Sequence, residues 1–300
     1  MRPRGALALR FVLAAPLLWL LAFFVAPFAI VLKLSFSRAV TAQPPYEPTF
    51  TFADGLSGLI ESGRQFTTES YALLFSDWLY LDAYVSSLRI AGLATLIALL
   101  IGYPLALAMS RAPSHWRARL IVLAIAPFWT SFLVRVYAWI VILKNEGLLN
   151  HALLGMGIIS EPLHIFATEG AVLIGLVYAY LPFTVLPIFN ALEKQDDALV
   201  EAALDLGATR VSAFWTVTFP LSLPGLYAGA LLMFIPATGE FVIPDLLGGS
   251  SDLMIGRVLW SEFFSNRDWP MASAAACVLL CVLLAPLLLF ERAQSREANT

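Results

Sequence analysis

Six long apolar stretches divide this 300-residue chain, and they limit its fold more than any other feature. An α-helix needs about 20 predominantly apolar residues to cross the hydrocarbon core of a bilayer, and each stretch supplies that length. The mean hydropathy of +0.81 is far above that of a soluble domain. We therefore predict an all-α membrane protein with six transmembrane helices, at residues 11–34, 88–109, 120–143, 171–191, 223–243 and 271–290.

Basic residues near the ends of these stretches predict the orientation of the chain. Six crossings place both termini on one side, and Lys and Arg residues of short loops favour the cytoplasm. On the side of the termini lie Arg2, Arg4, Arg10, Arg111, Arg117, Arg119, Lys194, Arg210, Arg292 and Arg296, whereas the short loops opposite carry Lys144, Arg257 and Arg267. We therefore expect both termini in the cytoplasm.

This orientation divides the chain into four parts. Residues 1–34 form a cytoplasmic tail and a first helix that is about twice as long as the apolar core of a signal peptide. Residues 35–87 form a periplasmic loop with interfacial helices, residues 88–290 form a core of five helices, and residues 291–300 form a cytoplasmic tail. The loop's aromatic residues favour anchoring at the headgroups over a binding role; they are Tyr71, Phe75, Trp78, Tyr80 and Tyr84.

Several classes of function are disfavoured by the sequence. The net charge of −3 and the scattered basic residues give no signal for nucleic-acid binding. Cys277 and Cys281 share a helical face within an apolar stretch and are expected to pack there. No catalytic arrangement and no metal site is expected, because the histidines at 115, 151 and 164 have no metal-binding spacing.

Many Pro and Gly residues interrupt the spans, which suits a translocation pathway.

The segment between the fourth and fifth stretches, residues 193–222, is long for a simple connection. Its pattern predicts one helix at residues 198–206 and a second from 210 to about 217. Polar side chains can cap both helices, a glycine allows a sharp turn between them, and a proline is expected to stop the second. In chain order these residues are Asp196 and Asp197, Gly207, Thr209 and Pro220.

Two interpretations of this hairpin are open from the residues alone. The hairpin could insert into a groove of a partner protein, since small Ala residues lie on one arm and Phe214 and Trp215 on the other. It could instead lie as an amphipathic hairpin on the inner leaflet.

The spacing within the hairpin resembles that of a known family. Three residues separate Glu201-Ala202-Ala203 from Gly207, and nine more precede Val217-Thr218-Phe219-Pro220. This pattern resembles the EAA loop of ABC-importer membrane subunits, with Val217 and Phe219 in place of Ile and Leu. The resemblance implies that the hairpin docks on a cytoplasmic ATPase through Glu201, Ala202, Ala203, Gly207, Val217, Phe219 and Pro220.

The chain contains no G-x-x-x-x-G-K-[ST] phosphate-binding loop. We therefore expect ATP and Mg²⁺ at separate ATPase subunits and no cofactor on this chain, which would be a transport subunit without an ATPase site of its own.

Ionisable residues within spans are costly and are candidates for function. Glu240 follows Pro236 and Gly239, where a broken helix can open to a cavity, and Asp245 lies a short distance further. These carboxylates favour a cationic substrate, although Glu240 could instead form a structural ion pair with Arg135 or another helix. For Arg135 we expect pairing or a contact with a backbone carbonyl. Aromatic residues that could hold an ammonium group, or simply pack, include Tyr137, Trp139, Tyr178, Tyr180 and Trp260.

A second resemblance extends from the first stretch to the last. It is carried by GEFVIPDLLGG at 239–249, LMIGRVLW at 253–260, NRDWP at 266–270, SLRIA at 87–91 and GYP at 102–104. These segments resemble polyamine-transporter permeases of the spermidine and putrescine family. The putrescine branch is the most similar, since spermidine-type members differ at the positions of Glu240 and Pro244.

The second resemblance implies a type I ABC importer permease with the MetI-like fold in the bacterial inner membrane. The expected partners are a second homologous permease subunit, two cytoplasmic ATPase subunits and a periplasmic polyamine-binding protein. Putrescine is the expected substrate and spermidine the alternative.

Two other functions are weighed against this one. An ABC permease for another solute would also carry the hairpin but would gain nothing from an acidic pathway if that solute were an anion. An ATP-independent cation transporter or channel would leave the Glu201 hairpin unexplained.

Overall fold

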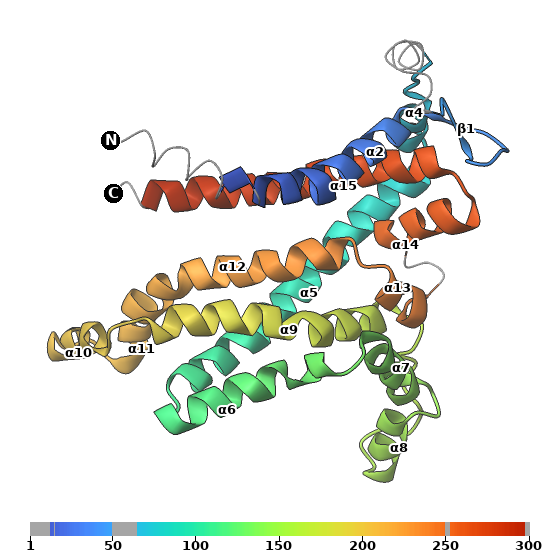
Figure 1. Cartoon of the computed structure of the whole chain (residues 1–300). Helices are drawn as coiled ribbons and strands as arrows, with labels where there is room; N and C mark the ends of the chain where they lie inside the picture. The colour runs from blue at the N-terminus through green and yellow to red at the C-terminus, as the bar shows by residue number, and fades with distance from the viewer. Residues whose placement is uncertain (1–12, 15, 50–64, 250–252, 298–300) are drawn as a thin grey trace, which may run out of the picture. The chain divides into compact units, whose positions relative to one another are not determined.

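The computed structural model describes residues 13, 14, 16–49, 65–249 and 253–297, which are mostly helical (Figure 1). The chain divides into two compact units. The first consists of Met1–Leu81 with Leu259–Val282, and the second of Asp82–Val258 with Leu283–Thr300. The expected N-terminal tail, Arg2, Arg4 and Arg10 included, lies outside the described residues.

Five helices in the described ranges are long and apolar enough to cross a membrane, and they confirm five of the six predicted spans. Several extend beyond the apolar stretch that predicted them; the helix over the second stretch has 33 residues. The five are Pro16–Ser35, Trp78–Ser110, Glu169–Glu193, Arg210–Thr238 and Trp269–Leu288.

The predicted span at residues 120–143 is interrupted after Pro127, and the two helices count as one crossing only if the bent pair forms a single broken span. The chain forms α6 (Ser114–Ile125), a 3₁₀ turn η3 (Ala126–Trp129) and α7 (Phe132–Leu143), with a bend of 87° at the break. Thr130 and Ser131 between them have extended backbone angles. The Pro127 carbonyl, freed from the regular helix, accepts bonds from the Thr130 amide at 3.3 Å and the Thr130 hydroxyl at 2.8 Å.

The first unit contains the N-terminal span, which includes η1 (Leu21–Val25) and α2 (Ala26–Ser35). A small antiparallel pair follows, β1 (Arg38–Ala39) with β2 (Tyr46–Glu47), and then α4 (Glu69–Ser76). Also in this unit are the start of α5 (Trp78–Ser110), η5 (Ser261–Ser265) and the first half of α15 (Trp269–Glu297). Cys277 and Cys281 are free thiols.

Polar contacts join the loop elements of the first unit to its spans. The Tyr71 hydroxyl donates to Ser35 Oγ at 2.8 Å, and the Tyr80 hydroxyl donates to Glu262 Oε1 at 3.0 Å. Tyr80 and Tyr84 are buried, so they do not form the exposed aromatic belt expected of them, whereas Phe75 and Trp78 are exposed.

The second unit is built on α9 (Glu169–Glu193) and α12 (Phe219–Thr238), which lie side by side (Figure 1). Gly225 and Gly229 allow this close approach, as a Cβ on Gly229 would lie 2.7 Å from the Thr184 carbonyl oxygen. One end of the helix pair carries α10 (Asp197–Asp205) and α11 (Arg210–Ala213), and the other carries α13 (Val242–Leu247). The remaining helices of this part are α8 (Leu148–Gly155) and α14 (Ile255–Trp260), whose last two residues belong to the first unit.

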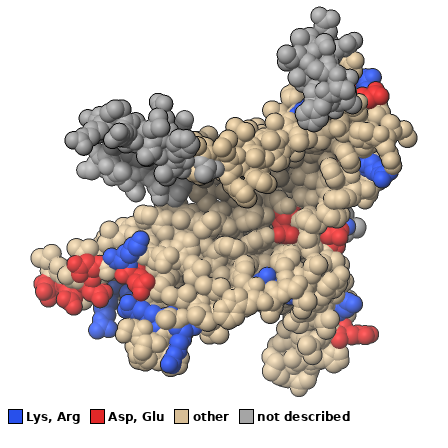
Figure 2. Space-filling view, in the orientation of Figure 1, with Lys and Arg blue, Asp and Glu red and all other residues tan. Residues whose placement is uncertain are grey.

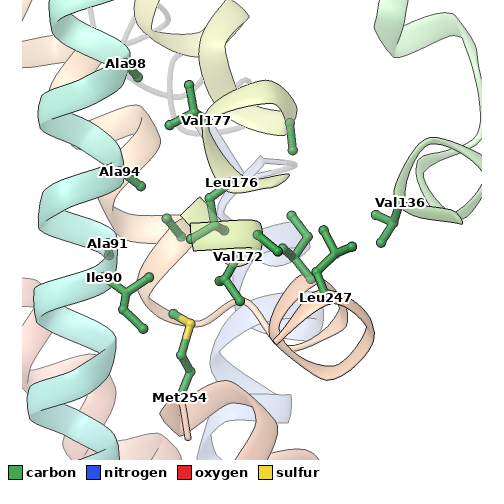
Figure 3. Packing of buried hydrophobic residues seen from close by; sticks show 14 of the residues in the cluster. Ile90, Ala91, Ala94, Ala98, Val136, Val172, Leu176, Val177, Leu247 and Met254 are labelled. Atoms are coloured by element: carbon green, nitrogen blue, oxygen red, sulfur yellow. The ribbon is translucent and has the colours of Figure 1, made fainter. Parts of the chain in front are cut away.

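The core of the second unit lies where α5, α7, α9 and α13 meet. Small side chains on α5 lie in one buried cluster with larger ones on α9 and α13 (Figure 3). The buried residues include Ile90, Ala91, Ala94 and Ala98 of α5, Val172 and Leu176 of α9, Val136 of α7 and Leu247 of α13. This core fixes α13 beside the break that precedes it.

Candidate functional site

The predicted hairpin between the fourth and fifth spans is present, and its first arm is capped as expected. Asp196 Oδ1 accepts a hydrogen bond from the Ala198 amide at 3.0 Å, which satisfies one of the free donors at the start of α10. Thr209 caps α11 in the same way, accepting from the Ser212 amide at 3.2 Å. Gln195 Nε2 donates to the Thr218 carbonyl at 3.0 Å and so joins the base of one arm to the other.

Gly207 forms the turn between the arms, as predicted. Its φ of +86° lies in the left-handed region, which is energetically unfavourable for any residue that has a Cβ. The Ala208 amide donates to the Ala203 carbonyl at 3.0 Å and the Gly207 amide to the Leu204 carbonyl at 2.9 Å. This is the Schellman pattern of helix ends, so the backbone itself specifies the turn.

The prediction that Pro220 stops the second helix is wrong. Residues Arg210–Thr238 form one continuous helix that joins the hairpin to the fifth span. A π-helical segment, η4 (Phe214–Thr218), precedes the proline, and the Phe219 amide bonds to the Phe214 carbonyl. The wider π turn lets the chain pass a residue that has no N–H to donate, and Pro220 lies in the first turn of α12.

The hairpin exposes apolar side chains on its outer surface. Leu206, immediately before the turn, is 90% exposed. Leu199, Val211 and Trp215 are also exposed, as is Ala202, whereas Ala203 and Val217 are half-buried. An exposed apolar surface of this kind, with charged residues around it, is typical of a site for protein binding.

Phe219 packs among aromatic residues of the hairpin and of α5. Its ring lies 5.1 Å from Trp215 and 5.6 Å from Tyr103 of α5, centroid to centroid. The Tyr103 hydroxyl also bonds to Ser222 Oγ at 2.9 Å. These contacts join the second arm to α5, a role for Tyr103 that the sequence did not predict.

A cavity of about 730 Å³ separates the hairpin from the ends of α5, α6 and α9. Glu201, an exposed side chain, lines this cavity together with Arg111, Arg117 and Arg210. Arg117 is already paired with Glu193 at 3.7 Å. Figure 2 shows acidic side chains gathered over α10 with basic ones beside them.

Glu240 lies in the break between α12 and α13 and is half-buried. Its Oε1 accepts from the Val242 amide at 3.0 Å and the Phe241 amide at 3.2 Å, and its Oε2 accepts from the Tyr180 hydroxyl of α9. Within the described residues no basic side chain pairs with it, so the considered ion pair with Arg135 is not formed. The carboxylate instead caps α13 and ties the break to α9.

Asp245 and Arg135 are placed differently from each other. Asp245 Oδ1 lies 3.1 Å from Arg257 Nε, and Arg257 Nη1 donates to the Gly249 carbonyl at 3.2 Å, so Asp245 is part of a structural ion pair.

The expectation that Arg135 pairs or contacts a carbonyl is wrong for the part of the chain that the structure describes. Its guanidinium carbon lies 5.0 Å from the centroid of the Phe128 ring.

The structure brings together only some of the predicted aromatic residues. Trp139 and Tyr178 meet edge to face at 5.3 Å, while Tyr137 is exposed on α7. Trp260 belongs to the first unit, where its ring lies 4.0 Å from that of Phe264. A row that the sequence did not predict runs from Tyr180 to Phe183 at 6.2 Å and on to Phe128 at 5.1 Å.

With this geometry established, comparison with known proteins identifies the family. The family described as binding-protein-dependent transport system inner membrane component matches residues 7–290. The chain belongs to this family. The permease is thus a multi-pass inner-membrane subunit of the ABC-importer type, a class of subunit that has no ATPase site of its own.

Curated relatives of the permease resemble it over most of their length. The spermidine/putrescine transport system permease protein PotB of Haemophilus influenzae is 45% identical over 227 residues, which are 76% of this chain and 79% of that protein. PotB of Escherichia coli K12 is 43% identical over 234 residues, 78% of this chain and 84% of its own.

Solved structures share the fold of the permease. A chain of a bacterial alginate ABC transporter, crystallised with an alginate pentasaccharide-bound periplasmic protein, has a TM-score of 0.74 at 18% identity. The match covers 100% of this chain and 99% of that one. A chain of the MetNI methionine ABC transporter has a TM-score of 0.54 at 17% identity, covering 72% and 94%. The MetI-like permease fold expected from the sequence is confirmed.

Proposed function

We propose that this permease imports a polyamine, putrescine first and spermidine second, in an ATP-driven complex. The observation that carries the proposal is the identity of 43–45% to spermidine/putrescine permeases over more than three quarters of the chain. Its partners are a second homologous permease subunit, two cytoplasmic ATPase subunits that bind ATP and Mg²⁺, and a periplasmic polyamine-binding protein. Both termini and the hairpin then lie in the cytoplasm.

In this proposal the hairpin passes movement of the ATPase to the membrane. Its outer surface docks on the ATPase, with the exposed Leu206 at the tip. Glu201, Ala202 and Ala203 lie on α10, the arm that leads to Leu206. The continuous helix Arg210–Thr238 supports this role, because at 1.5 Å per residue its 29 residues extend about 43 Å. A displacement at the hairpin therefore reaches the break at Glu240 without crossing a loop.

Glu240 supplies the negative charge for the ammonium groups of the substrate, and Trp139 and Tyr178 supply aromatic faces. Tyr137 and Trp260 are further pathway residues in this proposal. Asp245 contributes only when its ion pair with Arg257 opens. While the pair is closed, the positive charge of Arg257 offsets most of the attraction between the Asp245 carboxylate and a second cation.

An uptake experiment tests the proposed substrate. Cells that lack their own polyamine importers are given this permease with its partner subunits, and the entry of labelled putrescine is measured. We expect saturable uptake that unlabelled putrescine and, less strongly, spermidine compete away. Uptake that amino acids, sulfate or thiamine compete away instead, or that continues after ATP depletion, would exclude the proposal.

A further inference from the structure

Arg135, in the first half of α7, has the least satisfied side chain in the described part of the chain. Its Nε and Nη1 atoms are buried and have no hydrogen-bond partner there. The guanidinium carbon lies 5.0 Å from the Phe128 ring centroid and 5.7 Å from that of Phe132. Aromatic faces attract the charge but do not replace the oxygen acceptors that five N–H donors require. A buried donor without an acceptor is costly, so an acceptor is missing.

The carboxylates in the part of the chain that the structure describes do not supply that acceptor. Among the described residues no Asp or Glu lies within 4.0 Å of the Arg135 guanidinium. The two carboxylates expected near the pathway are engaged, Glu240 by Tyr180 and two amides, and Asp245 by Arg257. With no acceptor among the described residues, the structure favours a neutralising group on another molecule.

The surroundings of Arg135 favour a protein as that molecule. The span bends by 87° just before α7, and the exposed face of α7 is apolar. Acyl chains offer no hydrogen-bond acceptor, whereas charged residues within spans usually pair with charged groups of neighbouring helices. The exposed apolar side chains at and after the bend are Trp129, Leu133, Val134, Tyr137 and Val141.

We propose that Arg135 forms an ion pair with a carboxylate of the second permease subunit, and that this pair fixes how the two subunits meet along α7. The substrate cannot be the missing partner, because a polyamine is itself a cation. The inference rests on the proposed function, which supplies both the second permease subunit and a cationic substrate. Arg135 is then a determinant of assembly.

Assembly of the full complex tests this inference. A tag on this chain is used to purify it from membranes that contain all partner subunits, and the second permease subunit recovered per tagged chain is measured. The variants are Arg135→Glu, Arg135→Met and Arg135→Lys. Arg119→Glu is the matched control, because Arg119 is exposed on the neighbouring α6 and makes a comparable cation–π contact with Trp116 at 5.2 Å.

We expect Arg135→Glu and Arg135→Met to weaken the association by about 30-fold or more, as for loss of one partner of a buried charge pair. Arg135→Lys should retain most of it, and Arg119→Glu should match the unmodified chain. In the Arg135→Glu background, each membrane carboxylate of the second subunit is then replaced by Arg. One such replacement should restore assembly, which general misfolding of the variant would not permit.

Normal assembly of Arg135→Glu would overturn the inference, as would the failure of every carboxylate replacement to restore it. Normal assembly of Arg135→Met with loss of co-purified anionic phospholipid would overturn it in favour of a lipid phosphate. The proposed function is judged separately. A complex that assembles through Arg135 but takes up no polyamine would contradict the function and leave this inference in place.

Discussion

The Tyr180 hydroxyl donates a hydrogen bond to the Glu240 carboxylate and thereby joins α9 to the break between α12 and α13. The same carboxylate accepts the first two amides of the segment that leads into α13. One side chain thus holds the end of the long helix that begins at the hairpin. A substrate that bound Glu240 would compete with these bonds and would thereby act on the position of the break.

Glu240→Gln should lower polyamine uptake at least tenfold, because it removes the charge while a carbonyl oxygen can still cap α13. Tyr180→Phe, which removes only the hydroxyl, should have a smaller effect. Initial uptake rates at several putrescine concentrations separate a change in KM from a change in kcat. Unchanged uptake by Glu240→Gln would remove the carboxylate from the pathway.

Gly207→Val should uncouple transport, because a β-branched residue at φ +86° is strained by about 1–3 kcal/mol and the turn would open. Gly207→Asn should retain most activity, since Asn tolerates the left-handed region. Gly157→Val is the matched control: its φ is +67°, and a Cβ at either glycine meets nothing within 4 Å. Substrate-stimulated ATPase activity is the readout. Equal losses in both valine variants would point to general destabilisation.

Leu206→Ser should weaken binding of the ATPase subunit at least tenfold, because a leucine buried on docking contributes about 1.5–3 kcal/mol. Leu148→Ser on α8 provides the control, as Leu148 is also strongly exposed and lies outside the hairpin. Co-purification of the ATPase with the tagged permease measures the effect. Full recovery of the ATPase with Leu206→Ser would argue against docking through the tip.

Gly229→Ala should destabilise the permease by about 1–3 kcal/mol, since the added Cβ would lie 2.7 Å from the Thr184 carbonyl oxygen. Gly92→Ala on α5 should be neutral or slightly stabilising, as a Cβ there meets nothing within 4 Å. Thermal unfolding of the two variants in the same detergent tests the difference. Similar Tm values would show that α9 and α12 do not pack closely at this position.

Sequence reasoning succeeded where local chemistry decides the structure. Apolar length predicted five spans, and the caps at Asp196 and Thr209 and the turn at Gly207 follow from side-chain and backbone preferences that act over a few residues. Proline was an uneven guide: breaks do follow Pro127 and Pro236, but other prolines interrupt no helix. Pro104, Pro182 and Pro187 lie inside continuous helices, and Pro220 is passed by a π segment, yet the chain breaks just after Pro127. Within a membrane, neighbouring helices decide which proline ends a helix.

The candidate site was predictable only in part for a related reason. Glu240 could be selected because a charge within a span is costly, but its partner Tyr180 lies 60 residues away and no spacing connects them. Arg135 was expected to pair or to contact a backbone carbonyl, and its missing acceptor became visible only when the surrounding side chains were placed. Contacts between distant segments, unlike caps and turns, have no local signature in the sequence.

ATP hydrolysis by the complete complex in lipid nanodiscs tests the central claim most directly. The permease, its second permease subunit and the ATPase are assembled, and the periplasmic binding protein is added empty, loaded with putrescine or loaded with spermidine. We predict that the putrescine-loaded protein raises the rate several-fold over the empty protein, and the spermidine-loaded protein less. Equal rates with empty and polyamine-loaded protein, together with stimulation by another solute, would contradict the assignment as a polyamine importer.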